Sequence, residues 1–396
     1  MEACDSGATN CALLGGSDQR PKRVPQVAQV NPSERKLVTS ISGMALARIL
    51  PLRGVMERAM PPTHEAQAWT MHRICPIEWD SYIERCGGGF FHTLAGLHVL
   101  AREGELRFIE LRRGQEVIGV AAGILSACRL STQPRHVYLP TPPALLVEDR
   151  NEANGGLVET LRLSGAAEVI IDSFDATWCP NASKALIVNR RREYIVSLAG
   201  GVEGLGTRCG TLHRRGIRRG DRAGWSLRML QTTEAATLLL SIHKTTLEAR
   251  PADQDSGELP VGLAQLAINL RASSGVAVFS AWDGTVPLGA ALVGWANGKA
   301  CFVLGGSTPK GHSLSSAVWL HWRIMCMLSA AGFTVYNLGG TAVPVADKEE
   351  GVNPPSRFER DFGAESVECD SVRWILHVGH ARAHELGGRM SGSRSR

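Results

Sequence analysis

From about residue 68 onward, short apolar stretches alternate with amphipathic stretches, a pattern that is typical of an α/β protein. The apolar stretches at 106–111 and 117–125 flank the polar turn 112–115 and therefore predict a β-hairpin. The pattern of the first half as a whole predicts helices at 79–84, 90–100 and 151–164 and strands at 106–111, 117–125, 136–139 and 168–172.

The second half repeats this order of helix, hairpin, strand, helix and strand. Its predicted strands are 194–198, 225–229, 276–282, 287–295, 299–304 and 333–338, and its predicted helices are 202–223, 233–249, 259–273 and 313–331. The repetition indicates a duplicated α/β unit that divides near 175–190. We expect a disordered or over-extended leader at 1–66, domains at 67–185 and 186–380, and a polar tail at 381–396.

Composition narrows the class of protein. The 396 residues are 44% hydrophobic and 20% charged, which is ordinary for a globular chain. The formal net charge of +5 is too small to indicate nucleic-acid binding by itself, and only seven of the 43 basic residues are Lys. No apolar run reaches the roughly 18 residues that span a bilayer.

The N-terminus has no apolar segment of the secretory kind, and the ten cysteines form no C-x-x-C pair. These features predict a cytoplasmic protein with reduced thiols, without a structural metal site.

The segment 299–341 carries the clearest chemical signal. A predicted strand ends in Gly305, Gly306 and Ser307, a helix follows, and the next strand ends in Gly339 and Gly340. A strand, a helix and a strand in this order form a right-handed crossover with parallel strands, whose carboxyl ends meet at one edge of the sheet. Because ligands of α/β sheets bind at such an edge, we expect a binding site there, the alternative being that the glycines only form tight turns.

The amino end of the helix predicted at 313–331 faces the same edge, with Ser313 as its cap. Free N–H groups and the helix dipole favour a phosphate at this position. Lys310, Gly311 and His312 lie in the preceding loop and are candidate contacts of the donor, to which Lys310 and His312 could add positive charge.

Three motifs give the chain a family resemblance. Residues 330–341 read AAGFTVYNLGGT and are followed by RFERDFG at 357–363, residues 212–225 read LHRRGIRRGDRAGW, and residues 90–93 read FFHT. Together they resemble the FemAB-like branch of the GNAT acyltransferase superfamily over about 70–375. In that branch an Asp stands where this chain has Asn337 and a Lys where it has Glu359, which puts any role of those charges in doubt.

The resemblance implies two tandem GNAT-like domains, the second of which would hold an acyl donor between strands 299–304 and 333–338. Such proteins move an acyl or aminoacyl group from a thioester or a charged tRNA to an amine. The members that use tRNA carry a long paired-helix arm, and the stretch 233–273 is too short and too interrupted for that arm. We therefore expect acyl-CoA as the donor substrate, no tightly bound cofactor, and an amine acceptor such as an amino sugar or a cell-envelope precursor.

Two alternatives stay open: aminoacyl transfer from tRNA to a peptidoglycan-type precursor, and a non-catalytic binding protein of polysaccharide biosynthesis. For acyl transfer, Tyr336 is the candidate acid, with packing as the alternative, and His312 is a candidate base or phosphate contact. His321, Glu248 and Asp283 are weaker candidates.

One basic cluster lies on one face of the helix predicted at 202–223: Arg214, Arg215, Arg218, Arg219 and Arg222. It could contact an anionic acceptor or nucleic acid, or be a solvated surface. The acceptor, the acyl chain and the oligomeric state stay open at this point.

Overall fold

The computed structural model describes residues 66–101, 104–126, 135–148, 150–175, 178, 186–248, 270, 275–342 and 354–376. The expected leader and polar tail, and most of the helix expected at 259–273, lie outside these residues. The strands are β1 (Gln67–His72), β2 (Glu105–Arg113), β3 (Glu116–Leu125), β4 (Arg135–Leu139), β5 (Ala144–Leu145), β6 (Ala166–Ile171), β7 (Leu186–Ser197), β8 (Ser226–Leu230), β9 (Val276–Asp283), β10 (Val286–Ala296), β11 (Lys299–Ser307), β12 (Val335–Ala342) and β13 (Glu365–Ile375).

The α-helices are α2 (Trp79–Cys86), α3 (Leu94–Leu100), α4 (Arg150–Leu163), α5 (Gly201–Arg208), α6 (Thr211–Arg222), α7 (Thr233–Glu248), α9 (Pro309–Ser313), α10 (Ser316–Ala330) and α11 (Pro354–Arg360), and η1 (Phe90–His92) is a 3₁₀ turn. Within the described residues, no helix is long and apolar enough to cross a membrane.

The described strands form one continuous mixed sheet in the order β1-β2-β3-β4-β6-β13-β7-β12-β11-β10-β9-β8, with β5 on β3. Each half contributes an antiparallel meander followed by a strand, a helix and a parallel strand. In the first half this unit is β4, α4 and β6, and in the second it is β11, α10 and β12. The mixed α/β fold and the duplicated unit expected from the sequence are therefore confirmed.

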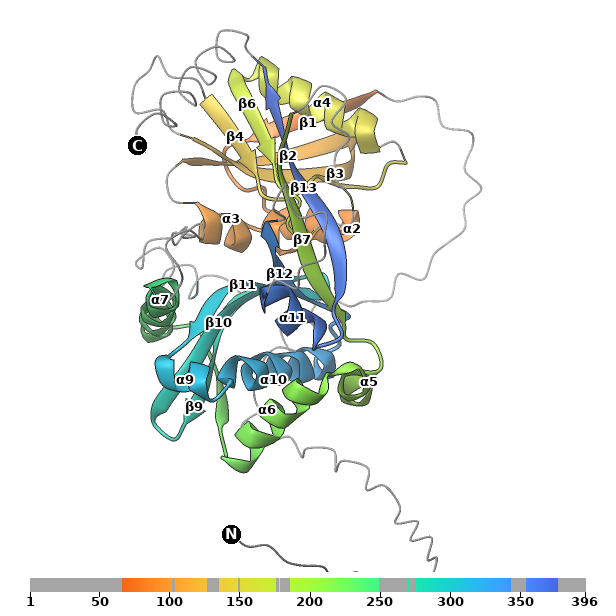
Figure 1. Ribbon diagram of the computed structural model, residues 1–396. Coiled ribbons are helices and arrows are strands. Elements are labelled where there is room, and N and C mark those ends of the chain that lie inside the picture. The colour runs from red at the N-terminus through yellow and green to blue at the C-terminus, as the bar shows by residue number, and fades with distance from the viewer. Residues whose placement is uncertain are drawn as a thin grey trace, which may run out of the picture.

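The last strand, β13, ties the two halves together. It pairs antiparallel with β6 of the first half through Val372–Ile375 and with β7 along most of its length. Figure 1 shows β7 and β13 as two long strands that run from one half of the molecule into the other. Periodicity did not predict β13, because its stretch carries four charged residues among eleven and has no clean alternation.

The sheet has a core on each face. On one face, α6 and α10 cover residues that include Tyr336 and Leu338. On the other face, α7 of the second half and η1 of the first half share a core with Leu292 and Cys301. A side chain of the first half thus packs on the second: Phe90 lies so close to Gly294 that an added Cβ would stand 2.5 Å from its ring.

Two predicted helices have other bounds in the structure. The helix expected at 202–223 is divided into α5 and α6, with Gly210 in an extended conformation before α6. The helix expected at 313–331 begins only at Ser316, as α10, because Ser315 takes a left-handed conformation with φ of 57°. The loop expected before it contains the short helix α9. The cap expected from Ser313 is therefore wrong: its hydroxyl donates to the Lys310 carbonyl at the end of α9.

Candidate functional site

The parallel strands β11 and β12 pair only at their beginnings. Their register runs from Lys299 opposite Val335 to Cys301 opposite Asn337 and stops there. Beyond this point β11 follows β10 as far as Ser307, while β12 follows β7 as far as Ala342. The two strands therefore diverge, and we call the diverging segments 302–307 and 338–342 the fork.

A β-bulge shapes the β11 side of the fork. Leu292 of β10 is opposite Leu304 and Val293 is opposite Phe302, so Val303 is the extra residue of β11. On the other side, Gly339 has φ of 81°, which favours glycine, and its N–H donates to Asn337 Oδ1 over 2.8 Å. Strand edges that leave each other in this way can offer backbone N–H and C=O groups to an extended ligand.

The corresponding strands of the first half stay together. β4 and β6 pair from Arg135 to Leu139. Two backbone bonds continue beyond their ends, from Asp172 N to the Leu139 carbonyl over 2.8 Å and from Phe174 N to the Pro140 carbonyl over 3.1 Å. Only the second of these two parallel pairs opens into a fork.

On the α10 face of the sheet, Tyr336 and His321 form a buried pair. The Tyr336 hydroxyl and His321 Nδ1 are 3.0 Å apart, and Tyr336 is fully buried. Burial raises the pKa of Tyr336 well above its ordinary value and lowers the pKa of His321 to about 4. His321 is thus neutral near pH 7.

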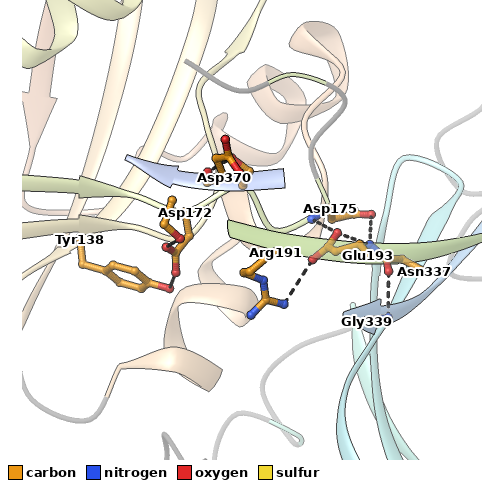
Figure 2. A network of polar contacts seen from close by, with 10 residues as sticks. Tyr138, Asp172, Asp175, Arg191, Glu193, Asn337, Gly339 and Asp370 are labelled. Atoms are coloured by element: carbon orange, nitrogen blue, oxygen red, sulfur yellow. Dashed lines mark hydrogen bonds and ion pairs between the residues drawn. The ribbon is translucent and has the colours of Figure 1, made fainter. Parts of the chain in front are cut away.

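On the opposite face, two carboxylates meet at the side-chain amide of Asn337 (Figure 2). Asn337 Nδ2 lies 2.8 Å from Glu193 Oε2 and 3.2 Å from Asp175 Oδ1. The backbone N–H of Asp175 also donates to Glu193 Oε2, over 3.0 Å, and Arg191 Nη2 lies 3.6 Å from Glu193 Oε1. Since Asn337 is the last residue of β12 that pairs with β11, this carboxylate pair lies where the fork begins.

Burial and mutual repulsion favour the protonated form of this pair. Burial raises the pKa of Asp175 to about 7, the bond from Asn337 opposes this rise, and the charge of Glu193 adds to it. Burial also raises the pKa of Glu193, against its bonds from Asn337 and Asp175. A carboxyl group that titrates near neutral pH can take up a proton in catalysis.

The glycines predicted to bind the donor lie along the two strands of the fork. Gly305 and Gly306 pair with Ala291 and Ala290 of β10. An added Cβ at Gly306 would lie 2.0 Å from Thr246 Oγ1, so this glycine allows α7 to pack on β11. Gly340 pairs with Glu193 of β7, and therefore the two Gly-Gly segments do not pair with each other. Their contact with a ligand, like that of Ser307, remains a prediction.

The remaining predicted phosphate contacts lie on α9. Lys310 Nζ forms an ion pair of 2.8 Å with Asp283, and Gly311 is buried with its N–H bonded to Thr308 Oγ1. His312 and Ser313 are exposed on the same short helix. Tyr336 and His312 belong to different elements, and their catalytic roles also remain predictions.

The five arginines of α6 are exposed, as expected, and the buried side of α6 rests on α10. An added Cβ at Gly220 would lie 2.3 Å from Trp319 Cδ1, whereas one at Gly216 would lie 3.4 Å from Val318. The two glycines thus allow the close approach of α6 to α10.

Sequence reasoning missed Asp175 and Glu193. Asp175 lies in the expected boundary between the halves, and Glu193 lies inside an apolar-basic strand, so neither belongs to a recognisable motif. The one usable signal was Asn337 itself, an amide at a family carboxylate position. Among the described residues, no group of His, Cys, Asp and Glu could hold a metal ion.

Comparisons with known proteins concern the fold and the second half of the chain. Residues 211–348 match the family model described as acetyltransferase (GNAT) domain. A crystal structure of FemX superposes with a TM-score of 0.58 at 13% identity, covering 76% of this chain and 96% of FemX. L-PGS from Bacillus licheniformis superposes with a TM-score of 0.50 at 11% identity, covering 81% of this chain and 98% of L-PGS.

No curated protein sequence matches the chain. The family match lies on the half that contains the fork, and the likeness to FemX extends over both halves. The segment 211–348 therefore matches an acetyltransferase (GNAT) domain, and the chain shares its fold with FemX.

Proposed function

We propose that the protein is an N-acyltransferase that moves an acyl group from acyl-CoA to an amine acceptor. The observation that carries the proposal is the fork: β11 and β12 stop pairing at Cys301 and Asn337 inside the matched GNAT domain. The thioester arm of the donor would lie along the fork. Backbone N–H groups near the bulge at Val303 would polarise the acyl carbonyl.

The reaction requires one proton transfer from the amine. The acceptor nitrogen attacks the thioester carbonyl carbon, a C–N bond forms, and the C–S bond breaks. We assign the proton of the amine to the Asp175–Glu193 pair, because the pKa of Asp175 is about 7 and the pair adjoins the start of the fork. The departing CoA thiolate takes a proton from solvent or from a nearby acid.

The residues predicted from the sequence have three roles in this proposal. Gly305, Gly306, Ser307, Gly339 and Gly340 are proposed to contact the donor arm through their backbone. Lys310, Gly311, His312 and Ser313 are proposed to lie near its phosphates, while Tyr336 is proposed as a donor of the proton to the thiolate only if its bond to His321 opens.

The acceptor class follows from the FemAB-like resemblance, so amino sugars and cell-envelope precursors are the first amines to test. Acyl-CoA is available in the cytoplasm, and we propose that the protein acts there. The exposed arginines of α6 favour aminoacyl transfer from tRNA as the second candidate.

The experiment is a transfer assay with acetyl-CoA and longer acyl-CoAs against a panel of amino sugars and other amines, read by mass spectrometry of the product. We expect an acylated amine, and a loss of about 100-fold or more in kcat for Asp175→Asn. Glu368→Gln is the matched control, because Glu368 is an exposed carboxylate on β13 paired with Arg192, and it should leave kcat unchanged.

Absence of product with every acyl-CoA would contradict the proposal. Transfer from aminoacyl-tRNA in the same panel would then support the second candidate. Absence of both would leave a binding protein as the function.

A further inference from the structure

A row of arginines on α6 forms a second charged feature beside the GNAT domain's α10. We propose that Arg215, Arg218, Arg219 and Arg222, which we call the arginine ledge, bind the phosphate groups at the nucleotide end of acyl-CoA. This inference rests on the proposed function and extends the donor site beyond the fork.

The ledge carries positive charge that no acid neutralises within the described residues. Its four arginines are exposed and, with Ala223, line a shallow hollow. Asp221, the acid on the same helix, is engaged elsewhere: its Oδ1 accepts from Trp319 Nε1 over 2.8 Å and from Arg323 over 2.9 Å. Like charges spaced three and four residues apart on a helix repel one another, so an anion in the hollow would relieve that repulsion.

The ledge adjoins the beginning of α10. Arg219 Nη1 donates to the carbonyl of Leu314 over 3.2 Å, and Leu314 lies two residues before α10. From there contacts lead to the fork: Ser316 Oγ donates to the Leu288 carbonyl, and the next residue, Gly289, is opposite Ser307 at the end of β11. A ligand that leaves the fork at Ser307 therefore meets the amino end of α10 and then the ledge.

The ledge is also fixed in place. Gly216 and Gly220 bring α6 against Val318 and Trp319 of α10, and Figure 1 shows the two helices side by side. A fixed helix keeps the four arginines on one side of the backbone before the ligand arrives, so that only their side chains must be ordered on binding.

The chemistry of the ledge suits clustered phosphates. The nucleotide end of CoA carries a diphosphate and a 3′-phosphate, and guanidinium groups bind phosphate oxygens in pairs. Single-stranded nucleic acid would call for aromatic side chains among the basic ones, and the ledge has none. We therefore commit to a small polyphosphate, the acyl donor, as the occupant.

The test is calorimetric binding of acetyl-CoA, dephospho-CoA and S-acetylpantetheine to the full chain. The variant is R218Q/R222Q. The control is R113Q/R214Q, which removes the same charge: Arg113 is exposed on the β2–β3 hairpin, and Arg214 lies on α6 but does not line the hollow. Thermal unfolding followed by circular dichroism confirms that each variant is folded.

We expect R218Q/R222Q to raise the Kd for acetyl-CoA about tenfold or more, and to leave the Kd for S-acetylpantetheine, which has no nucleotide phosphates, unchanged. The control should match the wild type with each probe. If R218Q/R222Q raises the Kd for dephospho-CoA less than the Kd for acetyl-CoA, the 3′-phosphate lies at the ledge. If it raises both Kd values equally, the diphosphate lies there.

An unchanged Kd for acetyl-CoA in R218Q/R222Q would overturn the inference while leaving the proposed function in place. Failure of the wild type to bind acetyl-CoA would overturn both. Binding of aminoacyl-tRNA that R218Q/R222Q abolishes, without acetyl-CoA binding, would overturn it in favour of nucleic acid.

Discussion

Asn337 and Glu193 lie on neighbouring strands, and the Asn337 amide donates to Glu193 Oε2 over 2.8 Å while its other contact reaches Asp175. The amide thus holds together two carboxylates that would otherwise repel each other. The carboxylate that the family resemblance implies at position 337 is absent from this chain. Two carboxylates from other segments lie beside Asn337 instead: Asp175 at the end of the first half and Glu193 of β7.

Replacing Asn337 by Asp should therefore destabilise the protein. A third buried carboxylate would remove two hydrogen bonds and add repulsion, so we expect the free energy of unfolding to fall by about 1–3 kcal/mol at pH 8 and by less at pH 5. Urea unfolding at both pH values measures the change. Adding Glu193→Gln to Asn337→Asp should restore part of the loss, and equal stability of N337D and wild type at pH 8 would refute this role of the amide.

The pKa of Asp175 should be visible in the pH dependence of stability. Its pKa is raised to about 7 in the folded protein from 3.8, so the folded state binds the proton more tightly than the unfolded state. The stabilisation of the folded state by protonated Asp175 is complete below about pH 4 and is lost as the pH rises toward 7. The unfolding free energy of the wild type relative to Asp175→Asn should therefore fall over this range.

Glu368 is an exposed carboxylate, so the unfolding free energy of the wild type relative to Glu368→Gln should not change with pH over this range. Glu359 offers a second case, because burial raises its pKa to about 7. The unfolding free energy of the wild type relative to Glu359→Gln should therefore also fall as the pH rises toward 7. If the difference in unfolding free energy between wild type and D175N is constant from pH 4 to pH 8, the pKa of Asp175 is not raised in the folded protein.

Two glycines on α6 should respond differently to the same substitution. Gly220→Ala would place a Cβ within 2.3 Å of the Trp319 ring, so we expect a loss of about 1–3 kcal/mol. Gly216→Ala would place its Cβ 3.4 Å from Val318, an ordinary contact, and the higher helix propensity of Ala should make it neutral or stabilising by up to about 1 kcal/mol. Thermal unfolding of the pair checks this, and similar losses for both would contradict the packing described for α6.

The two catalytic predictions from sequence can be separated by substitution. Tyr336→Phe leaves His321 Nδ1 without its partner, and we expect a stability loss of about 1 kcal/mol with a modest change in kcat. A fall of 100-fold or more in kcat would instead establish Tyr336 as the acid. His312→Gln, on the exposed side of α9, should leave stability unchanged, and a large fall in kcat/KM would establish His312 as a base or ligand contact.

Local patterns predicted most elements but not their long-range partners. The hairpin at 106–125 and the crossover at 299–338 carry strong alternation and clear turn residues, and both are present. β13 was missed because its place between β6 and β7 is decided by pairing with distant strands. The break at Ser315 was missed for a related reason, since serine is rarely left-handed and nothing nearby signals it.

The candidate site was predicted in outline only. The two Gly-Gly segments lie on the two strands that diverge, because their spacing reflects the crossover itself. Asp175 meets Asn337 across 162 positions of sequence, and such a contact has no local signature. The resemblance located position 337, and only the structure showed which carboxylates surround it.

A crystal structure of the full chain with acetyl-CoA would show directly where the acyl donor binds. We predict that the thioester arm lies between 302–307 of β11 and 338–342 of β12, with the phosphates toward the amino end of α10 and the arginine ledge. Acetyl-CoA bound outside this fork, for instance at the closed pair β4 and β6, would contradict it.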